Sequence, residues 1–136
     1  MNRRLYLRMG FILLALAVMI GAFGAHALKS LVAEAQVGTF ETGVRYHFYH
    51  AFGILILQFI PSGARYVNRT KWAARFFLIG IIFFSGSLYL LAMAEPLGIE
   101  SMKKLIGPIT PIGGMFFIGG WILALLSIKN NPNKSE

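Results

Sequence analysis

The segment FFLIGIIFFSGSLYLLAMA, residues 76–94, runs from end to end without a charged side chain. A helix needs about 20 predominantly apolar residues to cross the hydrocarbon core of a bilayer. Two further uncharged segments of similar length, residues 9–25 and 109–128, lie before and after it. Three such segments in a chain of 136 residues predict an all-α integral membrane protein.

The composition of the chain supports this prediction. Hydrophobic residues make up 57% and charged residues 13%, whereas a typical soluble domain has about 25% charged residues. The absence of cysteine excludes disulfides, thiolate metal sites and cysteine nucleophiles. The net charge of +8 could indicate nucleic-acid binding, but the basic residues flank the apolar segments and form no single stripe. We therefore expect no nucleic-acid partner and interpret the charge as a topology signal.

A fourth span is less regular. Residues 51–60 are apolar apart from Gln58 and are too short to cross alone, so the helix must begin near Thr42. This start draws several polar residues into its outer third, and the sequence PSG at 61–63 stops it. The predicted single domain therefore has spans at residues 5–28, 42–61, 73–94 and 109–128, followed by a polar tail at 129–136.

The connection between the first two spans has helical spacing of its own. Its apolar residues recur at intervals of three and four (Leu28, Leu31, Val32 and Ala35). This pattern predicts a short helix lying on the membrane interface and ended by Gly38. The expected architecture is an up-down bundle of four transmembrane helices with this interfacial helix between the first and second.

The distribution of basic residues predicts the orientation. Most of the 13 lysines and arginines lie in the N-terminal segment, the loop after the second span and the tail. The positive-inside rule then places both termini in the cytoplasm. The sequence AHA at 25–27 could instead be a signal-peptidase site. Because the preceding apolar stretch is longer than a usual signal core, we expect the first span to be retained.

Small residues recur along the predicted spans. They permit close contact between membrane helices, and the seven-residue spacing in the third and fourth spans favours the crossing angle of four-helix bundles. The predicted packing positions are Gly10, Gly21, Gly24, Gly80, Gly86, Ser87, Gly113, Gly114 and Gly120.

Four motifs occur in order along the chain: GAFGAHA at 21–27, ETGVRYHFYHA at 41–51, FSGSLYLL at 84–91 and GPITPIGG at 107–114. Together they resemble the membrane family labelled domain of unknown function 423. The resemblance covers nearly the whole chain and leaves out the basic N-terminus, the central loop and the tail. It implies a multi-pass protein of the bacterial plasma membrane, or of mitochondria in eukaryotes, and it implies no biochemical activity.

Polar side chains gather at one predicted depth near the outer face. An ionisable group buried in a membrane costs roughly 2.5–3.5 kcal/mol, so these groups should face the interior of the bundle. Glu41 and Arg45 are four residues apart and are expected to form a stabilising pair. Thr110 lies in the proline-bracketed start of the fourth span, where irregular backbone could bind an ion or substrate. The candidate ligand-binding residues are His26, Arg45, Tyr46, His47, His50, Tyr89 and Thr110.

Three interpretations of this group remain open. It could be a network of hydrogen bonds that fixes the register of the helices. It could bind a metal or haem through His26, His47 and His50, or grip a quinone or lipid head group. It could also relay protons or small solutes in an oligomer, although the inner halves of the spans offer only Gln58.

Familiar catalytic motifs are missing from the sequence, including a phosphate-binding glycine loop and the pattern HExxH. The leading hypothesis is therefore a non-enzymatic accessory or structural component of a membrane assembly. It would contact the lipid bilayer and other membrane proteins or a second copy of itself. No cofactor is predicted.

Overall fold

The computed structural model describes residues 3–60 and 67–128, and no strand occurs among them. The predicted tail at 129–136 and the stop signal at 61–63 lie outside the described residues. The elements are α1 (Arg3–Ala25), the 3₁₀ turn η1 (Leu28–Ser30), α2 (Glu34–Leu57), α3 (Val67–Gly80), the π-helical turn η2 (Ile81–Ser85), α4 (Gly86–Ala92), the 3₁₀ turn η3 (Glu100–Met102), α5 (Lys103–Ile106) and α6 (Ile109–Leu125).

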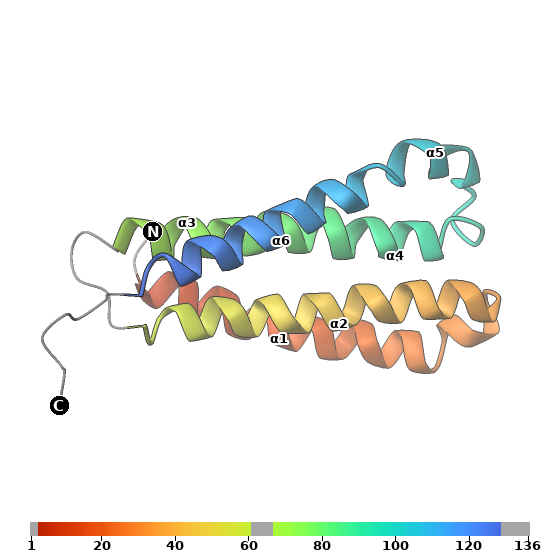
Figure 1. Cartoon of the computed structure of the whole chain (residues 1–136). Helices are drawn as coiled ribbons and strands as arrows, with labels where there is room; N and C mark the ends of the chain where they lie inside the picture. The colour runs from red at the N-terminus through yellow and green to blue at the C-terminus, as the bar shows by residue number, and fades with distance from the viewer. Residues whose placement is uncertain (1–2, 61–66, 129–136) are drawn as a thin grey trace, which may run out of the picture.

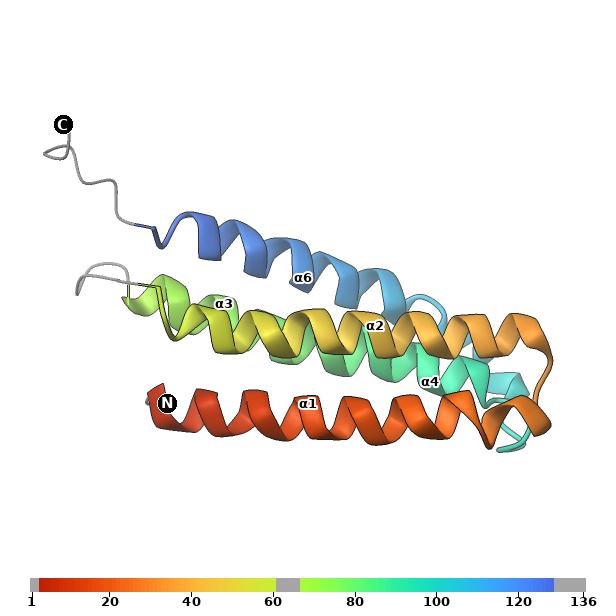
Figure 2. The same cartoon turned by 90° about the horizontal axis from the view of Figure 1, so that it is seen from below.

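Three helical segments are long and apolar enough to cross a membrane: Arg3–Ser30, Val67–Ala92 and Glu100–Leu125. They overlap the predicted first, third and fourth spans. α1 and α2 lie side by side and antiparallel, and the continuous rod of α3, η2 and α4 runs beside α2 (Figure 1). α6 packs on α3 and η2, on the side away from α1 (Figure 2).

The start of α2 differs from the prediction. The expected interfacial helix is reduced to the single turn η1, and α2 already begins at Glu34 and continues through Gly38. Glu34 favours this early start, because it places a negative charge in the first turn, which complements the helix dipole. The hydroxyls of Thr39 and Thr42 donate to the carbonyls four residues earlier, so the helix accommodates these polar side chains.

The turn η2 was not predicted. A π-helical turn contains one residue more than the α-helical turn it replaces and is found mostly inside longer helices, often at functional positions. Here it interrupts the third long helix at Ile81–Ser85. A run of isoleucine and phenylalanine carries no signal that separates α from π geometry, so sequence periodicity could not reveal it.

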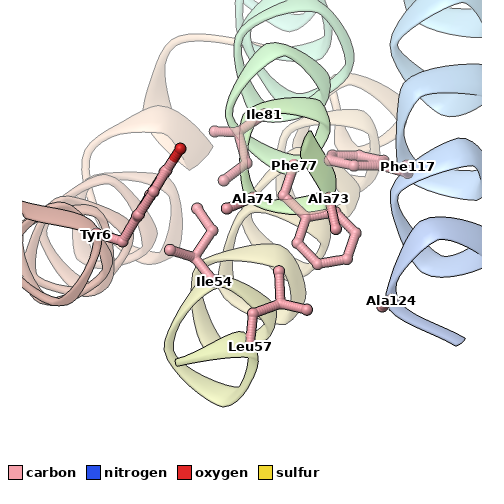
Figure 3. Packing of buried hydrophobic residues seen from close by; sticks show 9 residues of the cluster. All are labelled: Tyr6, Ile54, Leu57, Ala73, Ala74, Phe77, Ile81, Phe117 and Ala124. Atoms are coloured by element: carbon pink, nitrogen blue, oxygen red, sulfur yellow. The ribbon is translucent and has the colours of Figure 1, made fainter. Parts of the chain in front are cut away.

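Two hydrophobic clusters occupy opposite ends of the molecule. The larger contains Tyr6, Ile54, Leu57, Ala73, Ala74, Phe77, Ile81, Phe117 and Ala124, drawn together from four helices (Figure 3). The smaller contains Leu28, Phe40 and Ala92. The buried histidines of α2 lie along the helix between Phe40 of one cluster and Ile54 of the other.

The predicted packing glycines of α1 lie against α2. Gly10 faces Leu55, Gly21 faces Val44 and Gly24 faces the ring of Phe40. Two further glycines of α2, Gly43 and Gly53, were not predicted as packing positions. They admit the rings of Tyr89 and Phe77, which belong to the rod of α3, η2 and α4.

The predicted glycines of the third and fourth spans differ in how closely neighbouring atoms approach them. Gly80 admits the ring of Phe117, and Gly120 admits that of Phe77. Gly113 lies directly on the backbone of η2 at Phe84. At Gly86 and Gly114 an added Cβ would meet its nearest atoms at 4.0 and 3.7 Å, which is ordinary van der Waals contact, so a side chain could be accommodated at both positions.

Candidate functional site

The two histidines of α2 are both buried, each with 4% of its surface exposed, but they contact different helices. His47 Nδ1 shares a hydrogen bond of 3.2 Å with the hydroxyl of Tyr89 and so links α2 to α4. Its Nε2 is buried and has no hydrogen-bond partner among the described residues.

His50 uses both ring nitrogens within the chain. Its Nδ1–H donates to the carbonyl of Tyr46 at 2.8 Å, and its Nε2 accepts from the indole N–H of Trp121 in α6 at 3.1 Å. A carbonyl can only accept and an indole N–H can only donate, so the single ring proton must be on Nδ1. The imidazole also stacks on Phe117, with ring centroids 3.4 Å apart and planes 6° apart. A metal could bind His50 only after one of these hydrogen bonds had broken.

An open groove lies beside His50, between α2 and α6. Its volume is about 530 Å³, and its lining residues are Tyr46, Tyr49, His50, Phe84, Gly114, Phe117, Ile118 and Trp121. Tyr49 and Trp121 form its rim and are 57% and 45% exposed. Because the nitrogens of His50 are already engaged, the groove presents aromatic and aliphatic surface with no charged group.

The remaining predicted ligand residues are dispersed. His26 is exposed just beyond the end of α1. Arg45 is exposed and donates to the hydroxyl of Thr42 at 3.0 Å, and no ion pair joins it to Glu41, although both are described. No group of three His, Asp or Glu side chains in the described part of the chain lies close enough together to hold a metal ion.

Thr110 takes part in a contact between α6 and α4. Its hydroxyl lies 2.6 Å from that of Ser87, which in turn donates to the carbonyl of Phe84 at 2.9 Å. Since the one proton of Ser87 is used in the second bond, Thr110 must be the donor in the first. The start of α6, which is regular α-helix from Ile109 and lacks the expected irregular backbone, is therefore joined through Ser87 to the carbonyl of Phe84 in the π-helical turn.

The sequence analysis did not include two polar residues, Trp121 and Ser85, that lie near the buried histidines or their partners. Trp121 lies on α6, and its bond to His50 depends on the register between two helices that are far apart in the sequence. Ser85 ends η2, and its hydroxyl is fully buried with no partner among the described residues. It lies four residues before Tyr89, on a turn whose geometry was itself unpredicted.

Comparison with known proteins identifies relatives along nearly the whole chain. The family model described as "Protein of unknown function (DUF423)" matches residues 20–114. The UPF0382 membrane protein SH2409 of Staphylococcus haemolyticus is 36% identical over 91% of this chain and 94% of the relative. The UPF0382 membrane protein YwdK of Bacillus subtilis is 34% identical over 91% and 95%.

A further relative comes from a Gram-negative bacterium. The UPF0382 inner membrane protein YgdD of Escherichia coli K12 is 37% identical over 86% of this chain and 80% of the relative. No solved structure matches the chain.

Proposed function

The chain belongs to the DUF423 family of membrane proteins, and we propose that it is a non-enzymatic component of a membrane assembly. In this proposal His47 and His50 join the protein's own helices, and the aromatic groove between α2 and α6 receives a transmembrane helix of a partner. The observation that carries the first part is the engagement of both ring nitrogens of His50 inside the chain. Interhelical bonds of this kind commonly stabilise membrane helix packing.

The proposed membrane arrangement includes α2 as a fourth span. α2 has 24 residues and would be about 36 Å long at 1.5 Å per residue, enough to cross the hydrocarbon core. It lies antiparallel to α1 along its length (Figures 1 and 2), so a membrane crossed by α1 would enclose α2 as well. Its charged residues (Glu34, Glu41 and Arg45) lie in its first half, near the predicted outer face. The result is an up-down bundle with both termini in the cytoplasm.

Reporter fusions test this topology. We expect green fluorescent protein fused after residue 128 to fluoresce and alkaline phosphatase at the same point to be inactive, because both termini are cytoplasmic in this arrangement. Alkaline phosphatase inserted in the turn at residues 31–33 is expected to be active. An active phosphatase at the C-terminal position would contradict the four-span arrangement or its orientation.

The groove supports the second part of the proposal. It lies at the depth of the buried histidines, so its occupant must itself be embedded in the membrane. Gly114 has no side chain and therefore leaves room for a neighbouring helix to approach. Tyr49 and Trp121 supply the exposed aromatic surface that is enriched in protein interfaces.

Photocrosslinking in native membranes tests the partner. Ile118 and Met115 are exposed to a similar extent, 63% and 67%, but only Ile118 lines the groove. A benzophenone amino acid at position 118 is expected to give a protein adduct of one discrete mass, and the same group at position 115 is not. Adding Gly114→Leu should abolish the adduct because the new side chain fills the groove. Adducts of equal yield at both positions, or adducts to lipid alone, would contradict the proposal.

A small hydrophobic ligand is the second candidate occupant. The volume of the groove falls within the range of about 300–1,000 Å³ typical of ligand sites. Stacked rings also line it: Tyr46 lies 6.0 Å from His50 at an interplanar angle of 19°. A planar lipid-soluble molecule such as a quinone would suit these walls. Its stoichiometric recovery from gently purified protein, with loss on Gly114→Leu, would favour this candidate over a helix.

A further inference from the structure

Positive charge accumulates at the end of the molecule where α1 and α3 begin and α2 and α6 end (Figure 1). Six basic residues lie within the first nine residues of α1 or α3: Arg3, Arg4, Arg8, Arg69, Lys71 and Arg75. The four acidic residues of the described ranges lie toward the opposite end, at Glu34, Glu41, Glu95 and Glu100. The carboxylates of the described residues therefore lie away from this positive charge.

A cavity of about 230 Å³ opens within this basic end, between α1, the end of α2 and the start of α3. Tyr6, Leu57 and Val67 contribute apolar surface to its walls, and its polar groups come from Arg3, Gln58, Thr70 and Lys71. The cavity thus combines two cationic side chains with an amide and a hydroxyl, which is a donor set suited to a phosphate group.

Several contacts hold these walls in place. The hydroxyl of Tyr6 donates to the backbone carbonyl of Lys71 at 3.3 Å, so α1 and α3 are joined across the cavity. The guanidinium of Arg3 lies over the ring of Phe59, 5.5 Å from its centroid. Gln58 donates to the carbonyl of Ile54 at 2.9 Å, which fixes its amide at the end of α2.

We propose that this cavity binds the phosphate group of an anionic phospholipid, with Arg3 and Lys71 as the charged contacts. Its volume is below that of most sites for whole small molecules, so it would hold the head group and leave the rest of the lipid outside. Phe59 stands beside Arg3 and is 69% exposed, which offers an apolar surface to the acyl chains. The assignment is independent of what occupies the groove between α2 and α6.

The test is a lipid titration of the detergent-solubilised full chain, followed by native mass spectrometry. The probes are phosphatidylglycerol, phosphatidylcholine and inorganic phosphate. We expect the first phosphatidylglycerol to bind more tightly than phosphatidylcholine, and millimolar phosphate not to displace it. Replacing both contacts, Arg3→Gln with Lys71→Gln, should weaken phosphatidylglycerol binding about thirtyfold, since each basic residue near a lipid phosphate adds about 1 kcal/mol and two are removed.

The matched control is Arg4→Gln with Arg8→Gln. These arginines are exposed at the same end and carry the same charge, but neither lines the cavity. The control should change the affinity less than threefold. Lys71→Gln keeps the backbone carbonyl that Tyr6 bonds, and unchanged melting temperatures would show that all variants fold. Equal losses in the two double variants, or equal binding of the two lipids, would overturn the site. Displacement by inorganic phosphate would overturn its assignment to a lipid.

Discussion

Replacing Gly113 with alanine is expected to destabilise the detergent-solubilised protein by about 2–3 kcal/mol, in the upper range of overpacking substitutions. A Cβ at this position would lie 2.7 Å from Cα of Phe84 and closer still to its backbone nitrogen. No rotamer change can relieve this clash because both partners are backbone. α6 would have to move away from η2, which would strain the bonds of Thr110 to Ser87 and of Trp121 to His50. A thermal or denaturant unfolding curve measures the loss.

Gly114→Ala is the matched control on the next residue. Its Cβ would meet the ring of Phe84 at 3.7 Å, an ordinary contact. Alanine also favours a helix by about 1 kcal/mol over glycine, so this variant should be as stable as the wild type or slightly more stable. If the two alanine variants lost stability equally, α6 could not lie on η2 as described.

His50→Phe is expected to lower the free energy of unfolding by about 2 kcal/mol. Phenylalanine can keep the stacking on Phe117, but it removes the hydrogen bond to Trp121 and leaves the indole N–H without its acceptor. Trp121→Phe alone should cost about 1 kcal/mol. The double variant should lose less unfolding free energy than the sum of the two single losses, by a coupling of about 1 kcal/mol, because both single variants remove the same bond.

Tyr49→Phe provides the control for this cycle. Tyr49 lies at the rim of the same groove with 57% of its surface exposed, and no hydrogen bond of its hydroxyl occurs in the described structure. Its replacement should leave stability unchanged. Strict additivity of His50→Phe and Trp121→Phe would show that the two side chains do not interact.

The apolar segments of the sequence were sufficient to predict three helices long and apolar enough to cross a membrane, because length and lack of charge decide this property locally. The start of α2 was not predictable in the same way. Gly38 was expected to end a helix, but Val37 and Phe40 on either side of it bury apolar surface within α2, and tertiary packing outweighs the local preference of glycine.

The candidate site was predictable in its composition and not in its contacts. His47 and His50 are three residues apart on α2, a spacing that turns them by roughly 60° around the helix. That turn directs one to Tyr89 in α4 and the other to Trp121 in α6. The partner of each histidine depends on the register between helices, which a single sequence does not encode in any local pattern. The same limit applies to Gly113 and Gly114, which are neighbours in one motif yet differ in how closely Phe84 approaches them, with its backbone at Gly113 and only its ring at Gly114.

The position of the proton on His50 tests the account most directly, because a hydrogen-bonded joint between α2 and α6 requires one tautomer. Solid-state ¹⁵N spectra of histidine-labelled protein in lipid should show a residue with protonated Nδ1 and unprotonated Nε2, in contact with the indole N–H of Trp121. His50→Phe would identify these signals by their loss. A proton on Nε2, or a signal shifted by a bound metal, would show that His50 does not hold the helices together in this way.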